Sequence, residues 1–419
     1  MSNMTFMEKL LDGVEVEWKA LGDVSEFKNG FAFKSSLFKE IGLPIIRITN
    51  VDGKTVNLSD VKYFDPADYN IGNPLNYSII NGDVLIAMSG ATTGKIGYFN
   101  SSETAYLNQR VGKFEPKSEM LNNRYLYHFL LTKADFLYVL AGGGAQPNLS
   151  SNKLKEKLLI PIPCPDNPEK SLEIQSEIVR ILDTFTELTT ELTTELTARK
   201  KQYSYYRDQL LSFEEGEVEW KALGEIAKIY DGTHQTPKYT NTGVPFVSVQ
   251  NIKDLYATKK YISTEDFEKY KYKPRINDLF MTRIGDIGTC AIVVDNNPLA
   301  YYVTLTLIRT NKEIVHPKYL MHIIGSSVGK AELYKRTLIH AVPIKINLGD
   351  IGKINIPIPC PDNPERSLAE QARIVLILDK FDTLTHSISE GLPREIELRQ
   401  KQYEYYRDLL LSFPKPETV

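Results

Sequence analysis

Apolar residues recur every three or four positions along two long segments, which predicts two long amphipathic helices. The first stripe covers residues 178–210 and no proline or glycine interrupts it. The second covers residues 374–410, but Gly391-Leu392-Pro393 falls inside it, so we expect a kink or break at 391–393. Ser171 and Ser367 precede the stripes and are the predicted N-cap residues.

The sequence contains an internal repeat. Three blocks return in the same order and at nearly the same spacing: Val16–Gly22 at Val218–Gly224, Ile160–Leu172 at Ile356–Leu368, and Arg199–Phe213 at Arg399–Phe413. Between these blocks the two halves differ strongly. The sequence therefore predicts a duplicated frame that holds two different contents.

The contents of each half carry strand and turn signals, including a hairpin-like segment at 81–97 that aligns with 277–289. We expect a mixed α/β domain in each half and an internal pseudo-two-fold repeat. A helix with one apolar stripe must bury it, and its near-identical twin is the expected partner in an antiparallel coiled-coil-like pair. The alternative is that each helix packs on its own domain. The expected divisions are domain 1 at 1–160, helix 1 at 161–215, domain 2 at 216–356 and helix 2 at 357–419.

Composition is that of a soluble chain with more than one domain: 419 residues, 42% hydrophobic and 25% charged. No apolar run approaches the ~18 residues that cross a bilayer, and the first residues lack a secretory signal, so we expect a cytoplasmic protein. The net charge of −3 does not favour DNA binding. However, residues 218–356 contain 19 Lys and Arg against 13 Asp and Glu, and residues 16–160 contain 16 against 14. The acidic excess lies elsewhere, which leaves the α/β regions able to bind DNA.

Catalytic signatures are missing from the sequence. The segment Gly90–Lys95 resembles a phosphate-binding loop, but its glycines are one residue too close and Ile96 stands where a hydroxyl is needed, so a turn between strands is the better interpretation. The six histidines have no metal-ligand spacing, and the three cysteines form no disulfide framework. No motif for adenine methylation or methyl-donor binding is present. We expect a non-catalytic chain without its own metal or cofactor.

Two variable α/β regions between two near-identical long helices resemble the specificity subunit of type I restriction-modification systems, and the resemblance covers essentially the whole chain. Local motifs support it: Asp231–His234 leading to Gly243–Val249, Gly82–Leu85 with its partner Asn277–Leu279, and Gln146–Ser150 before the IPIP strand. One departure is that the second half has Lys345–Leu348 where the first has Gln146, so no base-reading role of Gln146 carries over to domain 2.

The resemblance implies that each target-recognition domain reads one half of a bipartite sequence in double-stranded DNA. It implies that the helices act as a ruler and dock two methyltransferase subunits, while restriction and motor subunits cut. The methyl donor and ATP would be bound by those partners. The main alternative is a protein–protein scaffold whose helices only dimerise; such a scaffold would lack a salt-dependent affinity for DNA.

Polar and basic residues beside glycine-bearing loops are the candidates for DNA contacts, because side chains there reach base edges and phosphates. In domain 1 they are Lys34, Arg47, Asn50, Ser89, Thr92, Lys95, Arg110, Gln146 and Asn148. In domain 2 they are His234, Gln235, Lys238, Tyr239, Ser248, Gln250, Arg283, Lys345 and Asn347.

The repeated aromatic–basic ends of the helices have two interpretations. Tyr203, Tyr206, Tyr403 and Tyr406 are candidates for subunit docking, and packing within the helix pair is the alternative and favoured interpretation. Residues 186–197 consist of three TELT units, which are either a solvated helical segment or a ruler that spaces the two domains.

Overall fold

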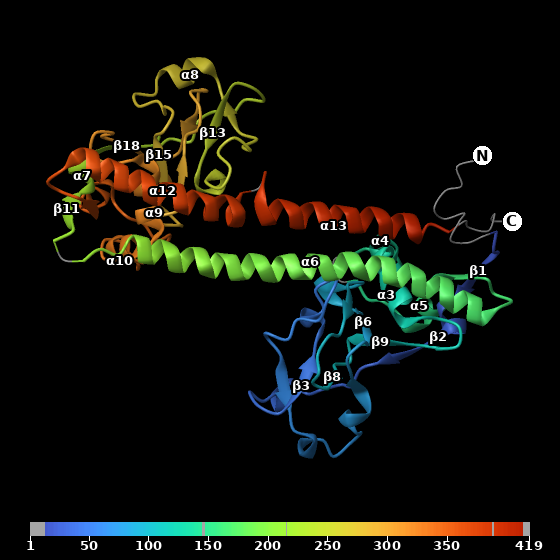
Figure 1. Cartoon of the computed structure of the whole chain (residues 1–419). Coiled ribbons are helices and arrows are strands. Elements are labelled where there is room, and N and C mark those ends of the chain that lie inside the picture. Colours follow the sequence, from blue (N-terminus) through green and yellow to red (C-terminus); the bar gives the residue numbers. More distant parts are fainter. Residues whose placement is uncertain (1–12, 145–146, 215, 388, 414–419) are drawn as a thin grey trace. The chain divides into compact units, whose positions relative to one another are not determined.

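The computed structural model of the chain describes residues 13–144, 147–214, 216–387 and 389–413. They form two compact units, and each unit is made from two separate stretches of the chain (Figure 1). Unit 1 takes its described residues from 1–191 and 396–419, and unit 2 from 192–395. Each unit thus contains one α/β region, the first part of one long helical segment and the last part of the other.

In unit 1, two four-stranded sheets lie beyond a two-stranded antiparallel ribbon. The ribbon pairs β1 (Val16–Ala20) with β10 (Leu159–Pro163). The first sheet has the order β2-β9-β6-β7, with bounds Ser25–Asn29, Val111–Pro116, Val84–Ala87 and Ile96–Tyr98. The second has the order β4-β3-β8-β5, with bounds Lys62–Phe64, Leu43–Ile46, Ala105–Leu107 and Ser78–Ile79. The helices are α2 (Leu21–Val24), α3 (Asn123–Leu131), α4 (Ala134–Leu140) and α5 (Ser151–Lys157).

Unit 2 repeats this plan with different details. Its ribbon pairs β11 (Val218–Ala222) with β19 (Asn355–Pro359). Its four-stranded sheet has the order β12-β18-β15-β16, with bounds Ala227–Asp231, Leu305–Thr310, Leu279–Thr282 and Cys290–Ile292. A three-stranded sheet has the order β14-β13-β17, with bounds Tyr261–Ile262, Val244–Val247 and Ala300–Tyr301. The helices are α7 (Leu223–Ile226), α8 (Thr264–Glu268), α9 (Pro317–Gly325), α10 (Ser327–Tyr334) and α11 (Leu348–Ile351).

The repeated blocks turn out to be structural partners. The VEWKA strand of each copy pairs with the IPIP strand of the same copy, so Trp18 stands opposite Pro161 and Trp220 opposite Pro357. The predicted hairpins are confirmed, because β6 pairs with β7 and β15 with β16 in antiparallel fashion. The mixed α/β fold and the internal repeat predicted from the sequence are therefore both present.

The long helices begin earlier than the sequence patterns indicated. Helix α6 covers Pro168–Leu210, and the second segment consists of α12 (Pro364–His386) and α13 (Gly391–Leu410). The predicted N-caps Ser171 and Ser367 are wrong: both serines lie inside the first turns, are buried, and accept hydrogen bonds from Gln175 and Gln371. Asparagine before a proline caps each helix instead, since Asn167 accepts from the Lys170 amide at 3.1 Å and Asn363 from the Arg366 amide at 3.0 Å.

Both sequence-based interpretations of the long helices hold in part. In unit 1, α6 and α13 run in opposite directions (Figure 1), and Phe185 stacks on Tyr406 at 5.2 Å between ring centroids. In unit 2, α6 and α12 do the same, and Tyr206 stacks on Phe381 at 5.6 Å. The start of each segment also packs on its own domain through Ile178 and, in the second copy, Ile374.

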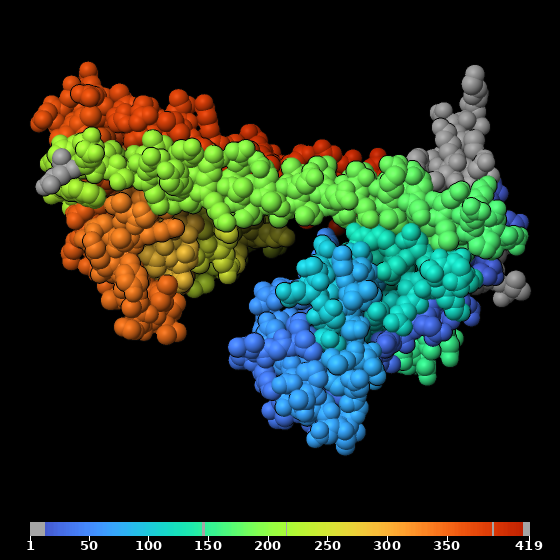
Figure 2. All heavy atoms as spheres, turned by 60° about the horizontal axis from the view of Figure 1, so that its bottom comes forward, coloured from blue at the N-terminus to red at the C-terminus, as the bar shows by residue number. Residues whose placement is uncertain are grey.

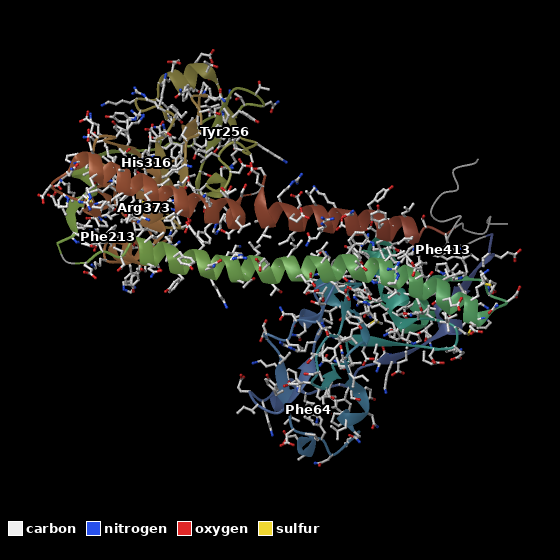
Figure 3. The ribbon with its side chains drawn as sticks, viewed as in Figure 1. Phe64, Phe213, Tyr256, His316, Arg373 and Phe413 are labelled. Atoms are coloured by element: carbon white, nitrogen blue, oxygen red, sulfur yellow. The ribbon has the colours of Figure 1, made fainter. Side chains whose placement is uncertain are left out.

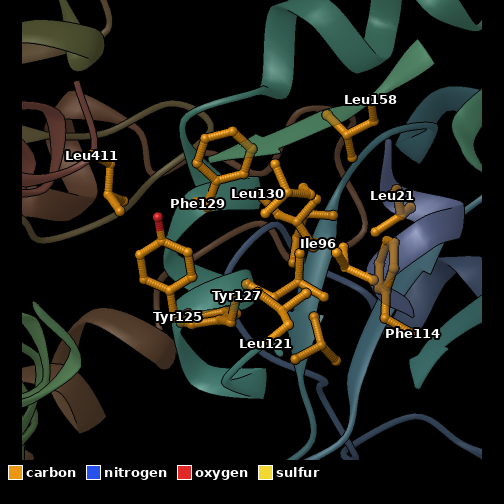
Figure 4. Close-up of a cluster of buried hydrophobic side chains, with 14 of the residues drawn as sticks. Leu21, Ile96, Phe114, Leu121, Tyr125, Tyr127, Phe129, Leu130, Leu158 and Leu411 are labelled. Atoms are coloured by element: carbon orange, nitrogen blue, oxygen red, sulfur yellow. The ribbon is translucent and has the colours of Figure 1, made fainter. Parts of the chain in front are cut away.

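The main hydrophobic core of unit 1 joins its α/β region to the long helices. In Figure 4, Phe129 and Leu130 of α3 lie among strand residues, with Leu411 from the far end of the chain beside them, and all belong to one buried cluster. Figure 3 places Phe413 beside the helices of unit 1 and Phe64 well away from them, in a second cluster. In Figure 2 the blue sheet region of unit 1 projects from the green helix, while the teal helical region lies against it. None of the helices described is long and apolar enough to cross a membrane.

Candidate functional site

In unit 1 four sequence-distant segments meet where strands β6 and β9 join their loops. The Met88 amide donates to the Arg110 carbonyl at 2.9 Å, and the Leu149 amide donates to the Met88 carbonyl at 2.7 Å. The Thr92 hydroxyl donates to the Ile48 carbonyl at 3.1 Å, which ties in the loop after β3. The fold thus gathers the loops that carry most of the domain 1 candidates.

The candidates differ in how accessible they are. Lys34, Lys95, Arg110 and Asn148 are exposed, whereas Arg47, Ser89 and Thr92 are half-buried. Asn50 is buried: its Oδ1 accepts from the Arg47 amide at 3.0 Å and its Nδ2 donates to the carbonyls of Asn57 and Asp60. Asn50 is therefore corrected from a DNA-contact candidate to a residue that shapes its loop. Gln146 lies outside the described residues.

Unit 2 assembles the equivalent loops with the same backbone contacts. The Arg283 amide donates to the Thr304 carbonyl at 3.0 Å and the Ile346 amide to the Arg283 carbonyl at 3.0 Å, matching the contacts of Met88 in unit 1. The exposed candidates there are His234, Gln235, Lys238, Tyr239, Gln250, Lys345 and Asn347, and Ser248 is half-buried. Arg283 is buried, so it too is corrected: it cannot present its charge to DNA, and it contacts Asp231 instead.

The exposed cations are electrostatically available. Among the described residues, Lys34, Lys95, Arg110, Lys238 and Lys345 form no ion pair within 4 Å. Other cations are held in partly buried ion pairs within the sheets: Lys113 with Asp83 at 2.9 Å in unit 1, and Arg309 with Asp278 at 2.6 Å in unit 2. Unpaired surface cations are the groups that bind phosphates, because nothing must be broken first.

Unit 2 also has an open hollow of about 520 Å³ beside its candidate residues. Its wall includes Lys238, Lys269 and Lys271, which outnumber the acidic residues Asp231 and Asp266. Tyr301 contributes a buried hydroxyl that has no hydrogen-bond partner among the described residues. The hollow thus has a positive balance and an unused polar group.

The repeated tyrosines are largely internal. Tyr403 is buried and its hydroxyl lies 2.9 Å from Nδ1 of His128, while Nε2 of His128 lies 2.8 Å from Oδ1 of Asp183. This connects α13, α3 and α6 within unit 1. Burial lowers the pKa of His128, which favours a neutral ring that donates to Asp183 and accepts from Tyr403.

Unit 2 contains the same triad in the second copy. Tyr203 lies 3.2 Å from Nδ1 of His322, and Nε2 of His322 lies 3.0 Å from Asp379. Burial raises the pKa of Tyr203 to about 12. Tyr203 and Tyr403 are thus corrected from docking candidates to buried structural residues, and Tyr206 and Tyr406 are engaged by ring stacking. The structure supports the packing interpretation for Tyr203 and Tyr403, whereas Tyr206 stacks on Phe381 and is still 39% exposed.

Sequence reasoning missed these histidine triads, although a signal was present. His128 and His322 lie in the related segments RYLYHFLL and KYLMHIIG. Asp183 and Asp379 each follow the CPDNP block of their own copy at the same distance in the sequence. A search for polar residues shared between the copies identifies them.

Comparison with known proteins follows the duplication seen in the fold. The type I restriction modification DNA specificity domain matches this chain twice, over residues 13–200 and 215–398. The chain belongs to the type I restriction-modification DNA specificity family. Each match covers one α/β region and most of the helical segment that follows it.

Relatives within this family resemble the chain over its whole length. The specificity subunit of the Escherichia coli type I restriction enzymes EcoR124I and EcoR124II is 40% identical, covering 100% of both chains. That of the E. coli enzyme EcoprrI is 33% identical over 93% of each. The crystal structure of the M. genitalium S subunit has a TM-score of 0.58 at 14% identity and covers 96% of this chain and 98% of its own. The last comparison supports the fold alone.

Proposed function

We propose that this chain is the DNA-reading subunit of a type I restriction-modification complex and that each α/β region reads one half of a bipartite target. The observation that carries the proposal is the double family match, because each match encloses one region with its own set of converging loops. The loops differ between the copies while the frame repeats. A duplicated frame with different contents suits the recognition of two different half-sites.

In this proposal the candidates divide by chemistry. The unpaired cations Lys34, Lys95 and Arg110 in unit 1, and Lys238 and Lys345 in unit 2, contact phosphates and position the domain. Exposed polar groups such as Asn148, His234 and Gln250 contact base edges and carry the sequence preference.

The chain supplies no catalytic group in this proposal. Methyltransferase subunits bind the methyl donor, and restriction subunits use ATP and cleave the DNA. The complex acts in the cytoplasm. Two related proteins support the assembly: the EcoR124I relative is named as a subunit of a restriction enzyme, and a solved structure with a TM-score of 0.56 belongs to work on complex assembly of the type I system. Tyr203 and Tyr403 are buried, so the exposed Tyr205, Tyr206 and Tyr405 are the aromatic groups available for docking.

A domain exchange tests the proposal. Residues 22–159 are replaced by the same region of a relative with a known target, and the complex with its methyltransferase subunits is tested by methylation sequencing. One half-site is expected to change to that of the donor while the other half-site is kept. Simultaneous change of both half-sites, or the absence of any methylated sequence with wild-type chain, contradicts the proposal.

A further inference from the structure

A chain of three polar side chains in unit 2 leads from the protein interior to the surface. Arg283 is buried, and its Nη2 donates to both carboxylate oxygens of Asp231 at 2.9 and 3.0 Å. Its Nη1 donates to the Ile346 carbonyl at 3.2 Å. Oδ2 of Asp231 also lies 2.8 Å from Nε2 of His234. The His234 ring is exposed and lies in the turn that follows strand β12.

The turn itself is held in place by the fold. Gly232 approaches the opposite backbone so closely that an added Cβ would lie 2.4 Å from the Tyr302 carbonyl carbon. Thr233 forms a bridge with Tyr302. The backbone on both sides of Asp231 and His234 is therefore fixed, and the ring direction is set by the carboxylate.

The equivalent positions of unit 1 lack this arrangement. Met88 occupies the place of Arg283, with the same backbone contacts, and β2 ends on Asn29 where β12 ends on Asp231. Ala32 stands in place of His234. A buried arginine–carboxylate pair gives little or no stability over an apolar residue of similar volume, because both charges must be desolvated. The shared fold thus has no need of the pair, which points to a role in what unit 2 alone recognises.

The hydrogen bond to Asp231 fixes which nitrogen of the neutral His234 ring carries the proton. A carboxylate only accepts, so Nε2 carries the proton and donates to it. In the neutral ring the remaining nitrogen, Nδ1, is then an acceptor. The ring is exposed at 70%, so Nδ1 is available to a ligand.

We propose that His234 reads an exocyclic amino group of one base in the major groove, with Asp231 and Arg283 as positioning residues. The inference rests on the proposed function. In the major groove adenine presents N6 amino hydrogens and cytosine presents N4 amino hydrogens, whereas guanine and thymine present acceptors there. An acceptor at Nδ1 therefore favours adenine or cytosine at this position and disfavours guanine and thymine.

The test uses the complex with its methyltransferase subunits and the target found by methylation sequencing. DNA affinity is measured for duplexes in which each adenine is replaced by purine and each cytosine by a pyrimidinone that lacks the amino group. One replacement in the half-site of unit 2 is expected to weaken binding by wild-type chain about three- to tenfold, the range of one net hydrogen bond. His234→Ala is expected to weaken binding of the intact target by a similar factor and to remove the sensitivity to that one replacement.

Positioning residues have their own signature. Asp231→Asn keeps the size of the side chain but not the charge that orients the ring, so sensitivity to the same replacement is expected to fall to a value between those of wild type and His234→Ala. The half-site read by unit 1 is the internal control and should respond equally in all three proteins. A purely structural role would weaken binding to every duplex by the same factor.

Three results overturn the inference. The first is an undiminished sensitivity to every amino-group replacement in His234→Ala. The second is a His234→Ala complex whose target, found by methylation sequencing, has lost its preference at a guanine or thymine instead, which would make His234 a donor. The third is the absence of any sequence preference in the wild-type complex, and this one identifies the proposed function itself, rather than the role of His234, as the failure.

Discussion

Removal of one hydroxyl, in Tyr403→Phe, tests the histidine triad that joins three helices of unit 1. The ring remains and continues to fill its buried site, so no cavity forms. The Tyr403 hydroxyl lies 2.9 Å from Nδ1 of His128, and the other ring nitrogen is already engaged by Asp183 at 2.8 Å. Without the hydroxyl, a buried acceptor on a side chain with 0% exposure loses its partner.

Leaving a buried polar atom unpaired costs about 1–3 kcal/mol. The expected loss of stability in unit 1 is within this range, and the opening that exposes amides of α13 should become roughly five- to 150-fold more frequent. Hydrogen exchange is the assay of choice, since the two units need not unfold together and a single melting curve would average them.

Tyr405→Phe is the matched control, because it lies two residues away on the same helix and is exposed. That variant should change stability by less than about 0.5 kcal/mol. Equal exchange rates in Tyr403→Phe and Tyr405→Phe would show that the hydroxyl does not satisfy the histidine, and the triad would lose its structural role. Tyr203→Phe repeats the test in unit 2, where the corresponding distance is 3.2 Å.

The remaining predictions concern pH, a buried ion pair and the helical spacer. Burial lowers the pKa of His128 below its ordinary 6.5, so the unfolded chain takes up this proton first. Unit 1 should have its full stability above pH 6.5 and should lose stability as the pH falls from about 6.5 towards the folded-state pKa of His128. Denaturant unfolding of wild type and His128→Asn over a series of pH values checks this. An equal dependence of the unfolding free energy on pH in the two proteins would refute it. Arg309→Met leaves the buried Asp278 carboxylate without its cation and should cost about 3 kcal/mol in chemical denaturation. Lys269→Met breaks an exposed pair and should cost far less; similar losses in the two variants would contradict the role of burial. Deletion of one four-residue unit within 186–197 shortens α6 by about 6 Å and rotates it by about 40° beyond a turn. The rotation is close to the ~35° twist of one base pair, whereas the translation alone corresponds to nearly two. Because base contacts need the correct groove orientation, methylation sequencing should find both half-sites kept and the spacer shortened by one base pair, with two as the alternative; an unchanged spacer would refute a ruler.

The sequence alone was enough for the architecture. Duplicated blocks predicted two copies of one frame, and the apolar stripes at 178–210 and 374–410 predicted the long helices. These signals are local and periodic, because an amphipathic helix or a hairpin is specified by residues a few positions apart. The family resemblance drew on the same repeated blocks.

The individual roles of the candidates depended on tertiary structure. Asn50 and Arg283 have the residue types of base-reading side chains, yet the fold buries both: Asn50 serves the backbone of its own loop and Arg283 holds Asp231. Tyr403 and Tyr405 are two residues apart in one helix and therefore lie on different faces, but only the position of α3 decides that Tyr403 bonds His128. Exposure and pairing are set by residues that are distant in sequence, such as Asp231 and Arg283, and the spacing along the chain carries no information about which of these come into contact.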